Sequence, residues 1–125
     1  MTMCDGRLKV IARSSRLSVW QVKEVFSYME GMEYDLIPLE SYGDKHKEIS
    51  LMDANIPADF FTREMDAAVL DGTADVAIHS AKDLPFPIPK GLEIYALMPA
   101  TDKTDSLISK DNLSLRQIGR ASCRE

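Results

Sequence analysis

The sequence has few cysteines, no long apolar run and no excess of basic residues, and each absence excludes a class of protein. Its two cysteines, Cys4 and Cys123, lie near opposite ends of the 125 residues, without paired spacing or a histidine cluster. This pattern indicates neither a disulfide framework nor a metal site. No segment approaches the roughly 18 consecutive apolar residues of a membrane span, and residues 1–7 lack the basic-then-apolar order of a signal peptide. We therefore expect a cytoplasmic protein that does not enter the membrane.

The net charge and the hydrophobic content bear on the binding partners and on the number of hydrophobic cores. The formal net charge is -5, whereas a protein that binds nucleic acid by counterion release needs lysines and arginines clustered on one face. We expect no nucleic-acid partner, although a local basic pocket for an acidic small molecule stays compatible with this charge. Hydrophobic residues make up 45% of the chain, which is enough for one core.

The first part of the chain predicts a strand, a turn and a helix. Leu8–Ala12 is a short apolar run, and Leu17–Glu30 follows with apolar residues at helical spacing. Ser14 or Ser15 suits the N-cap, and Gly31 suits the left-handed position after the helix. The apolar positions of this helix are Val22, Val25, Phe26 and Met29, and we assign Trp20 to the core as well.

The rest of the chain predicts further strands and one more helix. A second helical pattern begins at Asp59 and ends before Gly72, while Tyr42–Pro57 is polar and aperiodic, as in a long loop. Pro38 favours an edge position for the second strand. The predicted strands after the first are Tyr34–Ser41, Ala74–Ile78, Leu92–Leu97 and Thr104–Ser109. Strands that alternate with amphipathic helices indicate an α/β fold with a mixed, mostly parallel sheet and helices on both faces.

The end of the chain differs from the rest. Residues 1–100 form the predicted α/β domain, and residues 101–116 begin an element that the chain does not finish. We interpret that segment as a crossover into an incomplete second domain, so the chain is expected to be truncated. Residues 117–125 end in IGRASCRE, which resembles a translated sequencing-adapter sequence, and we interpret them as a non-native tail.

Polar residues follow two of the predicted strands, where an α/β sheet places its ligands. Arg13, Ser14 and Ser15 lie between the first strand and the first helix, and a guanidinium, hydroxyls and free N–H groups there suit a carboxylate or phosphate. Two other interpretations stay open. In them, Arg13 is a solvated turn residue, and the two serines act only as helix caps. Ser80-Ala81-Lys82-Asp83 follows the third strand.

The Lys82–Asp83 pair is the more unusual of these features. Neighbouring charges of this kind are commonly a surface pair of little consequence. Here the pair directly follows an apolar strand, and prolines at positions 85, 87 and 89 restrict the chain after it. A carboxylate held in a partly dry cleft stabilises positive charge on a ligand, and the adjacent ammonium would bind acidic groups of that ligand. We therefore expect a substrate that carries both signs of charge. His79 has no nucleophile motif around it and is interpreted as a packed residue.

Three stretches of the chain resemble the N-terminal part of the porphobilinogen deaminase (hydroxymethylbilane synthase) family. They are LKVIARSSRLSVWQ (8–21), FFTREMDAAVLDGTADVAIHSAKDLP (60–85) and GLEIYALMPATDKTDSLIS (91–109). The HS-x-KD-x-P signature is specific to that family. The resemblance implies a three-domain enzyme whose first two domains are like type II periplasmic binding proteins. That enzyme joins four porphobilinogen molecules into a linear tetrapyrrole and releases ammonia, and we expect the full-length form to be a monomer.

The resemblance also implies roles for individual residues. Asp83 would be the main catalytic carboxylate, with Lys82 beside it, contacting pyrrole N–H groups and stabilising the cationic methylene-pyrrolenine. Ser80, Lys82 and Asp83 would contact a dipyrromethane cofactor, which is attached to a cysteine of a C-terminal domain outside this chain. The implied substrate-binding residues are Arg13, Ser15 and Gln21.

The chain departs from the family pattern in one place. Family members carry a glycine-rich GGKG segment before the second helix, whereas this chain has Ile56-Pro57-Ala58-Asp59, so the loop lysine is missing. Cys123 lacks the motif that surrounds the cofactor-bearing cysteine, and the chain alone is expected to be inactive. Two alternatives stay open: a non-catalytic anion-binding module of periplasmic-binding-protein-like fold, and a structural or interaction domain.

Overall fold

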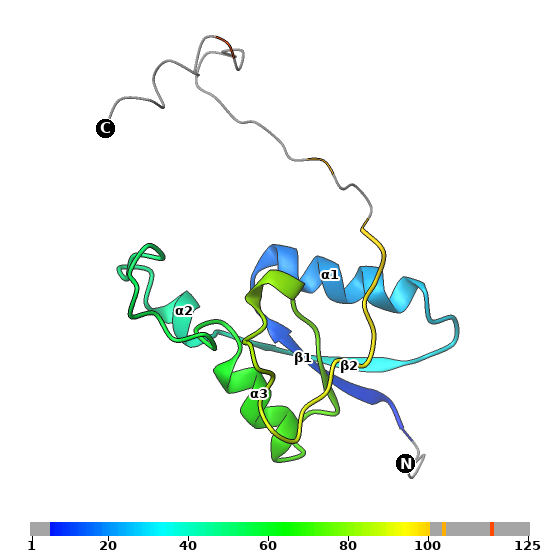
Figure 1. The fold of residues 1–125 in the computed structure, drawn as a ribbon. Coiled ribbons are helices and arrows are strands. Elements are labelled where there is room, and N and C mark those ends of the chain that lie inside the picture. The colour runs from blue at the N-terminus through cyan, green and yellow to red at the C-terminus, as the bar shows by residue number, and fades with distance from the viewer. Residues whose placement is uncertain (1–5, 101–103, 105–115, 117–125) are drawn as a thin grey trace.

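The computed structural model describes residues 6–100, 104 and 116, and they form a small α/β fold (Figure 1). The strands are β1 (Leu8–Arg13), β2 (Tyr34–Leu39) and β3 (Val76–Ala77). The helices are α1 (Arg16–Ser27), α2 (Tyr42–Lys45) and α3 (Arg63–Leu70), followed by a 3-10 turn, η1 (Ala81–Asp83). The predicted strand Thr104–Ser109 and the predicted segments 101–116 and 117–125 lie outside the described residues, apart from Thr104 and Arg116.

The sheet has the order β2-β1-β3, and β1 pairs in parallel with both neighbours. Backbone hydrogen bonds extend the short β3 ladder, because Asp75 N donates to Lys9 O and Ile78 N donates to Ile11 O. Pro38 lies on β2, at the edge of the described sheet, where its missing N–H costs no ladder bond.

Alternation along β1 gives the sheet two buried faces. Val10 and Ala12 pack with Val22 and Phe26 of α1, whereas Ile11 packs on the other face. The second cluster joins Ile11 to Met65 of α3 and to Ala74. Successive side chains of a strand point to opposite faces, so one apolar strand serves both helices. Figure 1 shows α1 and α3 on opposite sides of the strands, as the prediction of helices on both faces requires.

Helix α1 is shorter than predicted. Ser15 is its N-cap, since its hydroxyl accepts the Ser18 backbone N–H at 3.2 Å. The helix ends at Ser27 rather than Glu30, because the N–H groups of Tyr28 and Met29 turn to carbonyls three residues back and tighten the last turn. Gly31, at φ 77°, follows that turn.

Two predictions about apolar residues are wrong. Trp20 is 54% exposed, because it lies two residues, or about 200° around the helix, from the buried positions Ser18 and Val22. The segment Leu92–Leu97 is not a strand. Its one described backbone bond, Leu92 N to Pro89 O, closes a local turn, and Tyr95 is 92% exposed. A strand needs a ladder partner, and the described residues supply none for this segment.

The region between β2 and α3 is partly helical rather than a simple loop. Ser41 caps α2 in a reciprocal capping box with Asp44. Helix α3 begins at Arg63, after a turn closed by the Thr62 and Arg63 N–H groups on Asp59 O, and Gly72 follows it at φ 84°.

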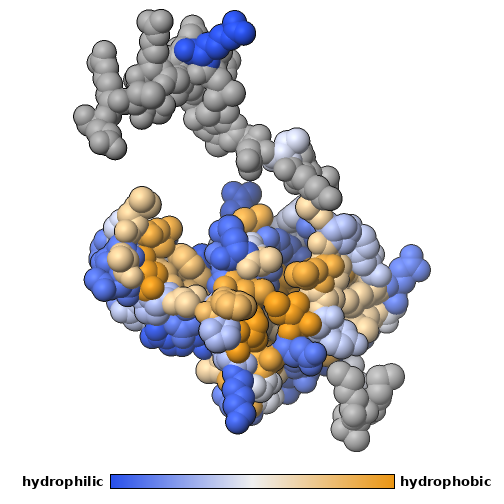
Figure 2. Space-filling view, in the orientation of Figure 1, coloured by the Kyte–Doolittle hydropathy of each residue, from blue (hydrophilic) through white to orange (hydrophobic). Residues whose placement is uncertain are grey.

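The surface formed by the described residues carries both apolar and hydrophilic side chains. Figure 2 shows apolar side chains gathered over the middle of the visible face, with hydrophilic residues around them. Within the described part, no helix is long and apolar enough to cross a membrane.

Candidate functional site

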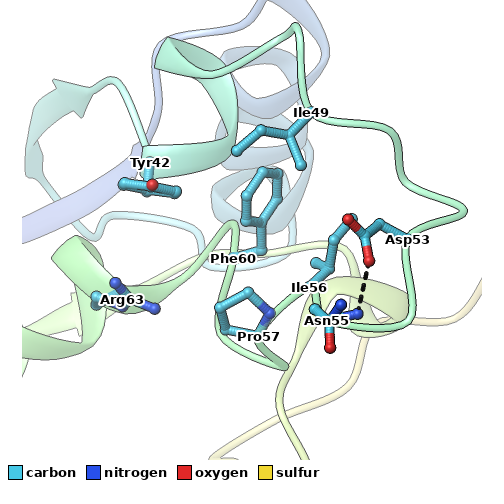
Figure 3. Close-up of a pocket in the computed structure, with 8 residues that line it drawn as sticks. All are labelled: Tyr42, Ile49, Asp53, Asn55, Ile56, Pro57, Phe60 and Arg63. Carbon is cyan, nitrogen blue, oxygen red and sulfur yellow. Dashed lines mark hydrogen bonds between the residues drawn. The ribbon is translucent and has the colours of Figure 1, made fainter.

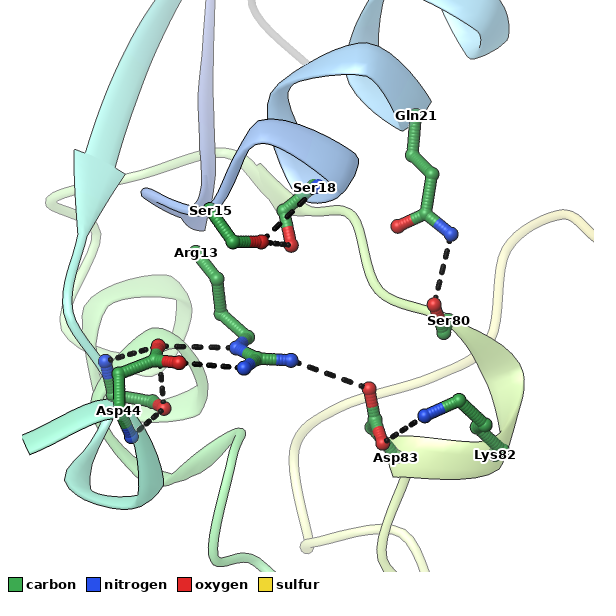
Figure 4. A network of polar contacts seen from close by, with 9 residues as sticks. Arg13, Ser15, Ser18, Gln21, Asp44, Ser80, Lys82 and Asp83 are labelled. Atoms are coloured by element: carbon green, nitrogen blue, oxygen red, sulfur yellow. Dashed lines mark hydrogen bonds and ion pairs between the residues drawn. The ribbon is translucent and has the colours of Figure 1, made fainter. Parts of the chain in front are cut away.

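The site lies where the two neighbouring parallel strands β1 and β3 end. Arg13 is the last residue of β1, and Ser80 through Asp83 follow β3. Because parallel neighbours end at the same edge of a sheet, these groups meet although about 70 residues separate them in sequence. Figure 4 shows their side chains converging there, together with Gln21 from α1 and Asp44 from α2.

The Arg13 guanidinium lies between two carboxylates. Its Nε and Nη2 donate to Asp44 Oδ2 and Oδ1 at 3.0 and 2.5 Å, a bidentate pair. Its Nη1 lies 3.6 Å from Asp83 Oδ2. The Phe61 ring covers one face of the guanidinium, with Cζ 4.4 Å from the ring centroid. Arg13 is therefore a bridging residue rather than a solvated turn residue.

Asp44 was not among the residues expected at this site. Its Oδ2 also accepts from the Ser41 hydroxyl at 2.8 Å and from the Ser41 N–H at 3.1 Å. The hydrogen bond from Arg13 lowers the pKa of Asp44 from 3.8 to about 2, against the opposing effect of burial. The sequence carried one signal, the Ser-x-x-Asp spacing of a capping box at positions 41–44, which predicts the helix turn but not the arginine partner.

This pKa gives a prediction for acid stability. The folded-state pKa of Asp44 is below its unfolded value, so its stabilisation is present above about pH 4 and is lost as the pH falls toward 2. We expect Asp44→Asn in the complete protein to lower the free energy of unfolding by about 2 kcal/mol at pH 7 and by far less at pH 2.5. Urea denaturation at the two pH values measures this difference. Equal destabilisation at both would contradict the assignment.

Asp83 is sheltered and is paired on both sides. Its side chain is 12% exposed, and its Oδ1 lies 3.2 Å from Lys82 Nζ, whose side chain is 79% exposed. The turn η1 holds it, because Asp83 N donates to Ser80 O at 3.0 Å. The Asp83 carboxylate thus has a cationic partner on each side, while the ammonium end of Lys82 stays open to a ligand.

Another side of the site is formed by polar side chains from α1, its N-cap and the segment after β3, namely Gln21, Ser15 and Ser80. Gln21 Nε2 donates to Ser80 Oγ at 2.8 Å and so ties α1 to the segment after β3. The Ser15 hydroxyl is engaged locally, since it contacts Ser18 Oγ at 2.8 Å and caps α1. The structure thus brings all six predicted residues to one edge of the sheet, with Ser15 in its capping role.

His79 is a buried residue beside this cluster. Burial lowers the pKa of His79, and the Asp83 carboxylate only partly offsets that effect, so the ring is neutral near pH 7. Its Nε2 is buried without a hydrogen-bond partner among the described residues. A neutral imidazole suits a packed residue that retains one polar atom for an incoming group.

One hollow adjoins the cluster, and a second hollow shares Ile49 and Phe60 with the first. One, of about 250 Å³, is lined by Arg13 and Asp44 together with His46, Lys47, Phe60 and Phe61 from the α2–α3 region, and by Gly43, Ile49 and Leu51. The other, of about 320 Å³, lies beyond Phe60 and is shown in Figure 3. At its rim, Asp53 Oδ1 accepts the Asn55 N–H at 2.9 Å, a local turn contact.

The donor set of the site suits a ligand with N–H donors and acidic groups. Asp83 offers carboxylate oxygens to N–H groups, while Lys82 and the unengaged N–H groups of Arg13 suit carboxylates. A dipyrromethane presents pyrrole N–H donors, so the residues present fit such a group. Among the described residues, no cluster of three or more His, Cys, Asp or Glu side chains is arranged for a metal ion.

Comparison with known proteins gives consistent matches over most of the chain. A family model described as "Porphobilinogen deaminase, dipyromethane cofactor binding domain" matches residues 8–123. The porphobilinogen deaminase of Moorella thermoacetica is 37% identical over 115 residues, or 89% of this chain and 36% of that protein. Those of Syntrophotalea carbinolica and Syntrophomonas wolfei are 32% and 34% identical over 93% and 92% of this chain, covering 38% and 39% of their own lengths.

Proposed function

The chain belongs to the porphobilinogen deaminase family, and from this premise we propose that it is the N-terminal part of a hydroxymethylbilane synthase. Such a transferase joins four porphobilinogen molecules into a linear tetrapyrrole and releases ammonia. The chain spans less than two fifths of the length of the relatives it matches. Activity therefore belongs to the complete enzyme, and we propose that this chain alone is inactive.

The sheltered Asp83 carboxylate is the observation that carries the proposal. Porphobilinogen is an aminomethyl pyrrole with acetate and propionate arms, so it has a cationic amine, an N–H donor and two acidic groups. Asp83 is 12% exposed and lies between Arg13 and Lys82, which matches those three features within one cluster. A simple anion-binding module would want cations and N–H groups at its centre, and a central carboxylate disfavours that alternative.

In the proposed reaction, Asp83 stabilises positive charge as the amine leaves. The C–N bond of the aminomethyl group breaks, the electron pair departs with ammonia, and a cationic methylene-pyrrolenine is left on the substrate. A fixed carboxylate in a partly dry setting lowers the energy of that cation without reorganising at the moment of reaction. The Asp83 oxygens accept the pyrrole N–H, which keeps the cation beside the charge that stabilises it.

The neighbouring residues bind and orient. Lys82 and the free N–H groups of Arg13 hold acidic arms, Ser80 and Gln21 supply polar contacts, and Ser15 places the N-terminus of α1 near the ligand. A bound dipyrromethane would supply pyrrole N–H donors, and Ser80, Lys82 and Asp83 are the residues that would hold it. The cysteine that attaches it lies outside this chain in our proposal.

Three further features are part of the proposal. The domain is of the type II periplasmic-binding-protein-like kind, a finer class than the parallel sheet with helices on both faces. The complete enzyme acts as a monomer in the cytoplasm. Each follows from the family resemblance and is compatible with the fold described above.

The function is tested by incubating the complete enzyme that contains this chain with porphobilinogen. We expect stoichiometric release of ammonia and formation of a linear tetrapyrrole, measured by an ammonia assay and by absorbance. The 125-residue chain is assayed in parallel and should give no sustained turnover. Binding of porphobilinogen by the complete enzyme without ammonia release would overturn the proposal in favour of a binding module.

A further inference from the structure

We propose that Asp44 is a positioning residue of this site: it fixes the plane of the Arg13 guanidinium so that the remaining edge of that group faces Asp83 and the ligand. The inference rests on the proposed function and concerns a residue that the family resemblance did not supply.

The contacts of Arg13 are divided between its two edges. Asp44 occupies the side edge, formed by Nε and Nη2, with both of its oxygens. Nη1 is turned to Asp83 at 3.6 Å, beyond hydrogen-bond range, so its N–H groups are not consumed. A bidentate pair fixes a guanidinium in two directions, whereas a single contact leaves it free to rotate. Figure 4 shows the guanidinium between the two carboxylates in this arrangement.

Asp44 is itself held in place by hydrogen bonds and packing, so it can fix the orientation of the Arg13 guanidinium. Three hydrogen bonds tie it to Ser41, the fully buried N-cap of α2. Gly43 packs closely against the rings of Phe60 and Phe61. A Cβ atom added at Gly43 would lie 2.6 Å from Phe61 Cδ1 and 2.7 Å from Phe60 Cδ1. Gly43 N also donates to Phe60 O at 2.9 Å. Helix α2 is thus docked on the same Phe61 ring that covers the Arg13 guanidinium.

The charges also indicate a role beyond capping. A capping box needs only a side-chain acceptor for the Ser41 N–H, and a neutral residue satisfies it. The ionised Asp44 shares the charge of Arg13 with Asp83, so Arg13 is not drawn wholly onto the catalytic carboxylate. Without the Asp44 charge, Arg13 would close on Asp83 and compete with the substrate for its oxygens.

A double-mutant cycle in the complete enzyme tests this inference. We expect Asp44→Asn to lower kcat/KM for porphobilinogen by about 10- to 100-fold, with the same division between kcat and KM as Arg13→Lys. In an Arg13→Lys background, Asp44→Asn should change kcat/KM less than about two-fold, because it acts through Arg13. Asp59→Asn is the matched control. It breaks the bidentate surface pair with Arg63 and should leave kcat/KM unchanged.

A crystal structure of the Asp44→Asn enzyme supplies a readout that does not depend on turnover. We expect the Arg13 guanidinium to rotate and its Nη1 to move within about 3.2 Å of an Asp83 oxygen. An unmoved guanidinium, or equal losses of kcat/KM in both backgrounds, would overturn the positioning role. If Asp44→Asn does not fold, Ser41→Ala takes its place in the kinetic cycle: it removes the hydroxyl that holds Asp44, so it should lower kcat/KM in the wild-type background and change it less than about two-fold with Arg13→Lys. A wild-type enzyme that releases no ammonia overturns the proposed function, while the crystal structure still decides the role of Asp44.

Discussion

Replacing Asp83 with alanine in the complete enzyme is expected to reduce ammonia release from porphobilinogen by about 10²- to 10³-fold or more. The Asp83 carboxylate is 12% exposed and lies between the Arg13 guanidinium and the Lys82 ammonium. Its removal leaves the departing amine with no fixed negative charge beside the developing cation. The measurement is the single-turnover rate of ammonia release at saturating porphobilinogen.

Two controls test whether the loss of activity comes from the loss of the Asp83 charge. Asp83→Asn keeps the shape of the side chain but not its charge, and we expect it to lose nearly as much activity as the alanine variant. Far-UV circular dichroism and the urea midpoint should show that both variants are folded. Activity retained by folded Asp83→Asn would remove the carboxylate from the proposed chemistry.

Replacing Arg13 has the second-largest expected effect, because two carboxylates depend on it. Arg13→Ala leaves Asp44 and Asp83 without their shared cation, and we expect a loss of about 3 kcal/mol in the free energy of unfolding together with most activity. Arg13→Lys keeps the charge but cannot form the bidentate pair with Asp44, so it should lose activity with a smaller change in stability. Urea denaturation and steady-state kinetics measure the two effects.

Arg63 provides the matched control for Arg13. It forms an equivalent bidentate pair with Asp59, but on the surface and between residues four apart in sequence. Arg63→Lys should change the free energy of unfolding by less than about 0.5 kcal/mol and leave the kinetics unchanged. An Arg13→Lys enzyme that behaves like Arg63→Lys would show that Arg13 is an ordinary surface residue.

The sequence predicts those features that depend on local pattern. The short apolar run of β1, the spacing of apolar residues in α1 and the glycine after α3 are each read from a few neighbouring residues. Arg13 and the Ser80–Asp83 segment converge because each follows one of two parallel strands, and that rule needs only the strand assignments. The exposure of Trp20 depends instead on which face of α1 meets the sheet, and the end of α1 depends on how its last turn tightens.

The features that the sequence does not predict depend on distant partners. Asp44 lies 31 residues from Arg13, in a region that looks like a polar loop, and only the folded chain brings the two together. Likewise, Leu92–Leu97 has the composition of a strand, but a strand exists only where a neighbour supplies hydrogen bonds. Composition and spacing do not identify such partners.

The central claim is that Asp83 faces the pyrrole nitrogen of the substrate from within a sheltered site. A crystal structure of the complete enzyme with a bound pyrrole ligand tests it most directly. We expect an Asp83 carboxylate oxygen within about 2.7–3.2 Å of a pyrrole nitrogen, with Arg13 still joined to Asp44. A ligand bound elsewhere, with Asp83 turned to bulk solvent, would contradict the account.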